Sequence, residues 1–206
     1  MEKNLVFIAV LFALISCNQS PQEKANALIE IDLKKSLFHP ESYDPAETII
    51  DSAFTPFDDP YFYEKAVNLC KLGIEMEEYE HKIKYEKSDM ALYKDLLKIM
   101  YSNRDKEKYD QAKENYEKYL AAKNNTEQKI VQLVEELKKD LEKESQFIGF
   151  KAKHRYRAQT NGGQIVFGEV KYLFDKEITK IVSAYDMDGD EYKAVQVLYK
   201  EMLGEE

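Results

Sequence analysis

An apolar stripe with helical spacing runs over residues 23–38, and we predict an amphipathic helix there. The helix should end before Pro40, because proline pushes the residue that precedes it out of the helical conformation. A short β-rich segment follows at residues 47–54. The helical stripe consists of Ala25, Leu28, Ile29, Leu33 and Leu37.

A much longer helical pattern begins at Pro60, where Asp58 and Asp59 offer capping carboxylates and proline takes the first helical position. Apolar residues then recur every seven positions, as in a coiled coil, until Ser102–Asp105 supplies a break and a new cap. The two runs have similar lengths and predict an antiparallel helical hairpin. An earlier break at Ser88–Asp89 would shorten the first arm. The predicted seam is Phe62, Leu69, Met76, Ile83, Met90 and Leu97 with Leu72, Tyr79, Tyr93 and Met100, followed by Tyr109, Ala112, Tyr116, Tyr119, Ile130, Leu133 and Leu137, with Lys123 and Thr126 interrupting it.

Strict alternation of apolar and polar residues from Ile148 to Ala158 predicts a β-strand with one apolar face and one basic face. The segment Asn161-Gly162-Gly163 turns the chain into a second strand. A three-residue loop sets Ala158 opposite Val166, Phe150 opposite Phe174 and Arg155 opposite Glu169, whereas a two-residue turn would bury Glu169 and Lys171. A turn at residues 175–177, a strand at 178–184 and a closing helix with Val195, Leu198, Tyr199 and Met202 on one face complete the chain.

These elements predict the α+β class of fold. We expect a small antiparallel sheet with flanking N- and C-terminal helices, all within residues 25–206. The coiled-coil-like hairpin is inserted at about residues 60–145, and its equal arms return the chain to the sheet.

The first residues predict where the protein is located in the cell. Residues 1–16 contain the apolar run Leu5–Ile15, which is as long as a signal-peptide core and too short to span a bilayer. The segment Leu14-Ile15-Ser16-Cys17 resembles the lipobox of bacterial lipoproteins. The resemblance implies cleavage before Cys17, acyl chains on Cys17, and a location at the cell envelope, with the outer membrane or cell surface preferred to the inner membrane. Residues 17–24 would then be the lipidated cysteine and a polar tether, and a plain secretory signal is the alternative.

A second resemblance lies in Leu37-Phe38-His39-Pro40-Glu41-Ser42-Tyr43. Small α+β envelope lipoproteins of uncharacterised function open similarly, with a helix and a Leu-x-x-Pro-x-Ser-Tyr turn. The resemblance implies a fold and no chemistry.

The net charge of −9 argues against nucleic acid as a partner, because phosphate binding needs a basic surface. Phosphate-binding, dinucleotide-binding and nucleophile-elbow motifs are missing from the sequence, so we predict no cofactor. The three histidines lack metal-ligand spacing. Cys70 lies in a strongly helical stretch and is expected to be a small buried hydrophobe, with a reactive thiol as the alternative.

Three features are candidates for binding. The basic strand face could contact an acidic ligand or partner, although the pattern favours the solvated side of an antiparallel sheet. The run of carboxylates from Asp186 to Asp190 resembles the start of an EF-hand loop, but Glu191 and Val197 stand where that loop needs glycine and glutamate, which favours an acidic helix cap over a metal site. The tyrosines of the hairpin could form a platform or simply pack the seam. The residues concerned are Lys151, Lys153, Arg155 and Arg157 for the basic face and Asp186, Asp188 and Asp190 for the acidic run.

Two classes of function follow. The first is a lipid-anchored envelope protein that acts as a non-catalytic binding or assembly module, with a membrane contact through its lipid and an envelope protein partner on the helical hairpin. The alternative is a small envelope enzyme acting on cell-wall or glycan polymers through an acidic site that no motif reveals.

Overall fold

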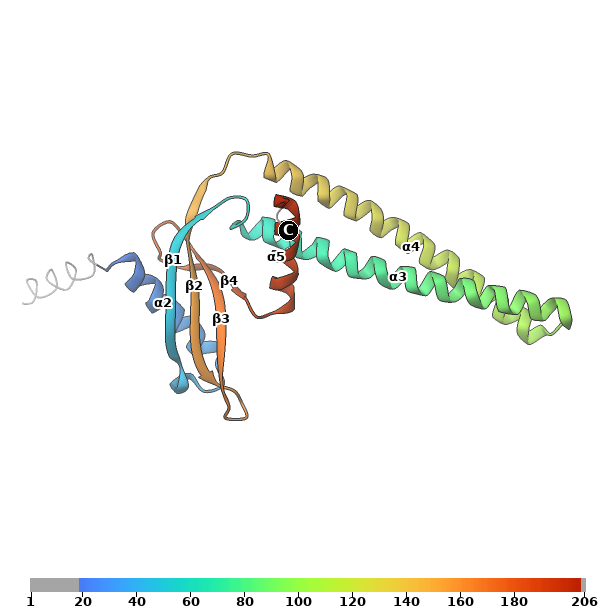
Figure 1. Ribbon diagram of the computed structural model, residues 1–206, viewed down its shortest axis with the longest axis horizontal. Helices are drawn as coiled ribbons and strands as arrows, with labels where there is room; N and C mark the ends of the chain where they lie inside the picture. The colour runs from blue at the N-terminus through green and yellow to red at the C-terminus, as the bar shows by residue number, and fades with distance from the viewer. Residues whose placement is uncertain (1–18, 205–206) are drawn as a thin grey trace, which may run out of the picture. The chain divides into compact units, whose positions relative to one another are not determined.

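A computed structural model describes residues 19–204 of the chain, and the leader and Cys17 lie outside these residues. The fold is α+β, as the sequence predicts (Figure 1). The elements in chain order are α2 (Pro21–Ser36), the 3-10 turn η1 (Pro40–Ser42), β1 (Asp44–Phe54), α3 (Pro60–Ile99), α4 (Asn103–Leu141), β2 (Phe147–Gln159), β3 (Ile165–Phe174), β4 (Ile181–Asp186) and α5 (Asp190–Leu203).

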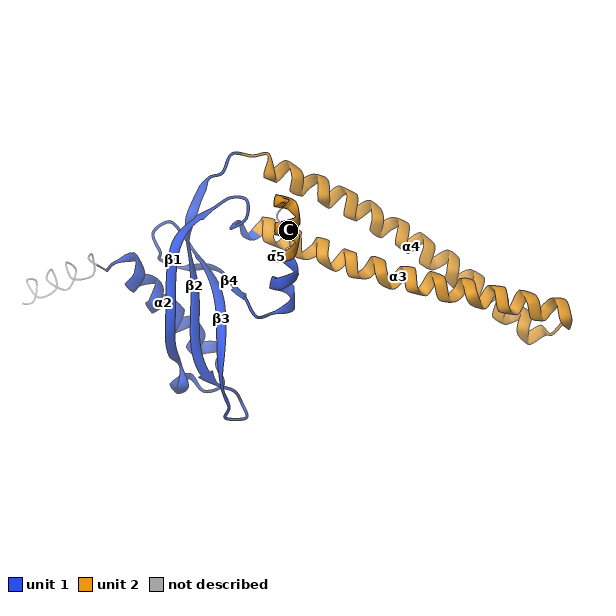
Figure 2. Ribbon diagram, viewed as in Figure 1, with its two compact units in different colours: residues 1–60, 144–196 blue, residues 61–143, 197–206 orange. Residues whose placement is uncertain are grey.

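The chain forms two compact units, coloured separately in Figure 2. The described part of the sheet unit consists of residues 19–60 and 144–196, and that of the hairpin unit consists of residues 61–143 and 197–204. The long insertion predicted at about residues 60–145 therefore forms a unit of its own, together with the end of α5.

The sheet has four antiparallel strands in the order β1-β2-β3-β4. Ala158 pairs with Val166 and Arg155 with Glu169, which confirms the register predicted for a three-residue loop. Gly163 lies in the left-handed region with φ 78°, where glycine costs least. The alternation of the strand therefore places Ala152, His154 and Ala158 in the interior, as their pattern predicts.

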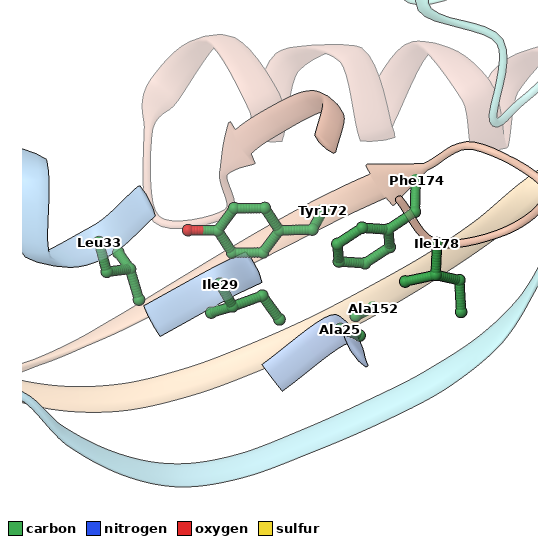
Figure 3. Close-up of a cluster of buried hydrophobic side chains, with 7 residues drawn as sticks. All are labelled: Ala25, Ile29, Leu33, Ala152, Tyr172, Phe174 and Ile178. Carbon is green, nitrogen blue, oxygen red and sulfur yellow. The ribbon is translucent and has the colours of Figure 1, made fainter. Parts of the chain in front are cut away.

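The core of the sheet unit lies between α2 and the inner face of the sheet (Figure 3). Tyr172 and Phe174 project from β3 toward the apolar stripe of α2, and their rings stack at a centroid distance of 6.2 Å. Full burial of a side chain such as Ile29 contributes about 1.5–3 kcal/mol to folding. The buried cluster is Ala25, Ile29, Leu33, Ala152, Tyr172, Phe174 and Ile178.

Three predicted boundaries were wrong, among them the start of β1, which lies at Asp44 and not at Glu47. The polar tether predicted to extend to residue 24 ends earlier, because α2 begins at Pro21. Ser20 and Glu23 form a capping box there, in which each side chain bonds the other's backbone N–H. The last strand begins at Ile181 and not at Ile178, since Ile178 turns the chain with φ 53° while its side chain stays buried in the core.

The turn that resembles the lipoprotein motif is held from both sides. Pro40 opens η1, and the Ser42 hydroxyl donates to the carbonyl of His39 at 2.6 Å. The same hydroxyl accepts from the backbone N–H of Gln159 at 2.8 Å, which fastens the turn to the end of β2. Tyr43 then reaches His154 in the interior of the sheet unit. The motif residues therefore attach α2 and β1 to β2.

In the hairpin unit, α3 and α4 have 40 and 39 residues, so the predicted arms of equal length are confirmed. The break lies where Ser102 caps α4, and α3 continues through Ser88–Asp89, which excludes the earlier break. Met100, predicted in the seam, is exposed in the connection instead. Antiparallel contacts link the arms along their length, and they pair Lys65 with Asp140, Glu80 with Lys123, Glu86 with Asn115 and Tyr93 with Lys108.

The two predicted interruptions of the seam are accommodated differently. Thr126 is buried, so its side chain occupies a seam position. Lys123 turns aside and forms an ion pair with Glu80 at 2.8 Å. Among residues 19–204, no helix has the length and apolar character needed to cross a membrane.

Candidate functional site

The four predicted basic residues of β2 each contact a carboxylate or an aromatic ring of the sheet unit. Two of the partners are carboxylates of β1 and β3, one is the buried carboxylate before α3, and one is an aromatic ring. These contacts engage the four side chains within the sheet unit, and recognition of an acidic ligand by this face stays a prediction. The pairs are Lys151 with Asp58 at 2.8 Å, Lys153 with Glu169 at 3.1 Å, Arg157 with Asp44, and Arg155 over the ring of Phe167 at 4.8 Å.

Asp58 is the centre of this outer face. Its side chain is 6% exposed and accepts hydrogen bonds from the ammonium groups of Lys151 and Lys171, both at 2.8 Å, and from the backbone N–H of Phe54. Burial alone would raise the pKa of Asp58, but the hydrogen bonds from the two lysines hold it below its usual value. Lys151 is thus a structural residue that the basic pattern did not distinguish from its neighbours.

The acidic run forms the turn that opens α5. The Asp186 carboxylate accepts from the backbone N–H of Asp188 at 3.0 Å, and the Asp186 carbonyl accepts from Gly189. Asp190 is the first residue of α5, so its charge favours the positive end of the helix dipole. In the described residues 19–204, no three His, Cys, Asp or Glu side chains are grouped so that they could hold a metal ion.

An open groove lies beside these carboxylates, on the inner face of the sheet between α2 and β4. We call it the α2–β4 groove, and its volume is about 460 Å³. One wall comes from α2, the floor from β2 and β3, and the far side from β4 and the turn after it. It is lined by Asp32, Leu33, Ser36, Tyr156, Phe167, Gly168, Val170, Tyr172, Ala184, Asp186 and Asp188.

The floor of the groove is aromatic, and glycine lets the rings lie close to the backbone. A Cβ at Gly168 would stand 2.7 Å from the ring of Tyr156, so only glycine admits that ring in its present place. Behind Tyr156, the ring of His154 stacks at 5.8 Å with an interplanar angle of 11°. The conformation of Tyr156 is thus held from two sides.

His154 is buried and fully hydrogen-bonded, as its place on the apolar face predicts. Its Nε2 lies 3.0 Å from the Tyr43 hydroxyl and its Nδ1 lies 2.9 Å from the Thr48 hydroxyl. Burial lowers the pKa of His154 and raises that of Tyr43 to about 12, so both groups are neutral near pH 7. The lipoprotein-like turn therefore supports the groove through Tyr43, His154 and Tyr156.

The rim of the groove is acidic. The Tyr172 hydroxyl donates to Asp32 at 3.3 Å, and burial together with the charge of Asp32 raises the pKa of Tyr172. Burial and then the charges of Asp186 and Asp188 raise the pKa of Tyr156. Neutral phenol rings surrounded by carboxylates favour a positively charged group, because such a group gains from both the carboxylates and the ring faces.

The groove adjoins a strand edge that β4 leaves uncovered. The β3–β4 ladder ends at Val170, and beyond it only Met187 donates to the carbonyl of Glu169. The carbonyl of Gln164 points toward β2, where it accepts from the backbone N–H of Thr160. Successive residues of a strand direct their N–H and C=O groups to opposite sides, so those of Ile165 and Phe167 point to the open edge.

The side chains along this edge are apolar and exposed, with Ile165 68% and Phe167 57% accessible. An uncovered apolar edge of this kind is a template for pairing with another strand.

The hairpin tyrosines are used within the hairpin unit. The ammonium group of Lys82 lies over the rings of Tyr79 and Tyr119, and that of Lys108 lies over Tyr93 and donates to its hydroxyl. These rings pack the seam and its rim, which favours the seam interpretation over a platform. Cys70 is half-buried on α3.

Sequence reasoning named Asp186 and Asp188 only as a cap or a metal site, and it missed Asp32, Gly168 and the open edge. Asp32 interrupts no apolar position of its helix, so the pattern gave no reason to single it out. Gly168 was the available signal, because glycine within a strand marks a close approach of another group.

Comparisons of the chain with protein-family models, with curated proteins and with solved structures find no match.

Proposed function

We propose that this protein is a lipid-anchored component of the bacterial cell envelope and acts as a non-catalytic binding module. Its ligand in this proposal is an extended, basic segment of a partner protein, held by the α2–β4 groove. The observation that supports this best is that the acidic, aromatic groove is continuous with the uncovered edge of β3, since Phe167 belongs to both. The proposed location at the cell envelope rests on the lipobox-like segment that ends at Cys17.

An added strand explains both features together. A peptide that pairs with Ile165 and Phe167 gains backbone hydrogen bonds that are independent of its sequence. Its alternate side chains then face the groove, where carboxylates of Asp186 and Asp188 and the ring of Tyr156 favour lysine or arginine. In this proposal the backbone hydrogen bonds at the edge of β3 supply the affinity for the peptide, and the side chains of the groove supply the selectivity for basic residues.

The enzyme alternative finds less support in this geometry. General acid catalysis by a carboxyl group needs a buried environment that raises its pKa. In the groove, Asp32 is half-buried and hydrogen-bonded to Tyr172, while Asp186 and Asp188 are exposed. This arrangement favours binding of a cation over proton transfer to a glycan.

The test uses a fluorescein-labelled peptide of alternating valine and lysine, with a valine-glutamate peptide as the probe of opposite charge. The protein is the chain from Asn18 onward, which keeps every described helix and strand, because these lie between Pro21 and Leu203. Fluorescence anisotropy should show saturable binding of the lysine peptide and none of the glutamate peptide.

Two variants separate the contributions of edge and groove. Ile165→Pro removes an edge N–H, and the pair Asp186→Asn and Asp188→Asn removes the rim charges. Each change should weaken lysine-peptide binding by about tenfold. Glu47→Gln is the matched control, since it removes one exposed charge from β1 on the opposite edge of the sheet. Equal binding of the two peptides, or equal losses in the control, would refute the proposal.

A further inference from the structure

The connection between α3 and α4 lies at the end of the hairpin (Figure 1). It exposes a cluster of large apolar side chains. Ile99 is 83%, Met100 74% and Tyr101 69% accessible, and Leu96 is exposed one turn earlier. We call Leu96, Ile99, Met100 and Tyr101 the hairpin tip. Neighbouring apolar residues with this much exposure mark a site of interaction.

Cations accompany the hairpin tip. Residues 90–110 contain five lysines and arginines against four acidic residues, in a chain whose net charge is −9. Lys98 pairs with Asp95 and Lys106 with Asp110, whereas Lys94 and Arg104 form no ion pair within the part of the chain that the structure describes. The residues around the hairpin tip therefore carry a small excess of positive charge in an acidic protein.

We propose that the hairpin tip inserts into the interfacial region of a lipid bilayer with anionic headgroups. Ile99 and Met100 enter the boundary of the acyl chains, and Tyr101 stays at headgroup depth, where aromatic residues with a polar end collect. Lys94, between one and two turns before the end of α3, and Arg104, in the first turn of α4, contact lipid phosphates.

The chemistry of the surface favours a bilayer as the occupant. The apolar residues lie at the end of a helical connection and are flanked by cations, which is the arrangement of peripheral membrane anchors. Charge complementarity points the same way, because anionic headgroups attract each nearby lysine or arginine while the rest of this acidic chain is repelled. This contact is independent of the groove and of acylation at Cys17.

The experiment measures sedimentation of the chain from Asn18 onward with vesicles of two compositions. One is phosphatidylcholine alone, and the other contains one third phosphatidylglycerol. We expect binding to the anionic vesicles that exceeds binding to the neutral ones by about tenfold and weakens as salt is added. Met100→Asp should reduce the anionic partition coefficient by about tenfold or more. Ile74→Asp, an equally apolar-to-acidic change at an exposed position of α3 remote from the tip, should leave it within about twofold.

Fluorescence gives a second readout that does not depend on affinity. The chain contains no tryptophan, so Met100→Trp introduces a single tryptophan, whose emission is distinct from that of the tyrosines. Its emission should shift to the blue on addition of anionic vesicles, and that of Ile74→Trp should not. Circular dichroism verifies that each variant keeps its helices. The proposal is wrong if neither vesicle binds, if Met100→Asp binds as the unchanged chain does, or if both tryptophans respond alike.

Discussion

At Asp58 one buried carboxylate holds two ammonium groups from neighbouring strands, Lys151 on β2 and Lys171 on β3. Because these lysines are themselves partly buried, an amide at this position would leave two partly desolvated charges without a counter-ion. We predict that Asp58→Asn lowers the free energy of unfolding by about 3 kcal/mol, measured by urea denaturation at pH 7. Asp51→Asn, an exposed change on β1, should cost less than about 0.5 kcal/mol. Similar losses in the two variants would contradict the central role of Asp58.

His154 makes the stability of the sheet unit sensitive to mild acid. Its pKa in the folded protein is lowered by burial, so between that value and the ordinary value of about 6.5 the unfolded chain binds more protons than the folded one. The stabilisation is therefore complete above about pH 6.5 and is lost as the pH falls through the lower, folded value. We predict a decrease in the free energy of unfolding between pH 7 and pH 5.

Replacing the histidine tests this assignment. His154→Gln keeps polar atoms near the hydroxyls of Tyr43 and Thr48 but cannot titrate, so urea denaturation should show a smaller loss between pH 7 and pH 5. His81→Gln, at an exposed position of α3, should retain the wild-type dependence. A loss of stability that is undiminished in His154→Gln would assign the effect to other groups.

At the scale of elements, the periods of apolar residues predicted the helices and three of the four strands closely. The loop Asn161-Gly162-Gly163 fixed the β2–β3 register, because one choice of loop length buries charged residues and the other does not. The start of α2 was missed although Ser20 and Glu23 were visible, since the polar segment was interpreted as a tether. Ile178 adopts a turn conformation that its β-branched side chain disfavours, so no local rule places it there.

The hairpin seam contains a buried carboxylate at a position that the predicted apolar seam leaves out. Glu86 falls three residues after Ile83, at a seam position, and it is buried. Asn115 of the opposite arm donates to its Oε1 at 3.1 Å, and both line a cavity of about 230 Å³ between the arms. A single polar layer of this kind sets the register of paired helices at a cost in stability. We infer that this pair aligns the two arms.

Substitution of this layer gives opposite results for one partner and for both. Asn115→Leu alone leaves the buried carboxylate unpaired and should lower the midpoint of thermal unfolding, followed by circular dichroism. The double variant Glu86→Leu and Asn115→Leu replaces the polar layer by an apolar one and should raise the free energy of unfolding by about 1–3 kcal/mol. Glu78→Leu, at an exposed position of α3, serves as the control. If the double variant is less stable than Asn115→Leu, the Glu86–Asn115 pair does not lower the stability of the hairpin relative to an apolar layer.

At the scale of the whole molecule, the candidate site could not be predicted because its parts are distant in the sequence. Asp32 comes from the first helix, Tyr156 and Tyr172 from neighbouring strands, and Asp188 from the last turn. None of these residues departs from the sequence pattern of its own element, so the pattern gives no reason to select it. Only the packing of α2 on the sheet and the early end of the β3–β4 ladder bring the acidic rim, the aromatic floor and the open edge together.

The proposed membrane anchoring also concerns the whole molecule, and the chain offers a matched pair of cysteines for its test. Cys17 and Cys70 are the only thiols, so Cys17→Ser should abolish incorporation of labelled fatty acid while Cys70→Ser should leave it unchanged. Because two or three acyl chains give stable anchoring, the Cys70→Ser protein should sediment with the envelope membranes in full. The Cys17→Ser protein should show a markedly smaller membrane fraction, reduced to what its uncleaved leader or the hairpin tip can hold. Labelling that persists in Cys17→Ser, or that disappears in Cys70→Ser, would contradict the lipobox assignment and leave the binding groove to be explained in another compartment.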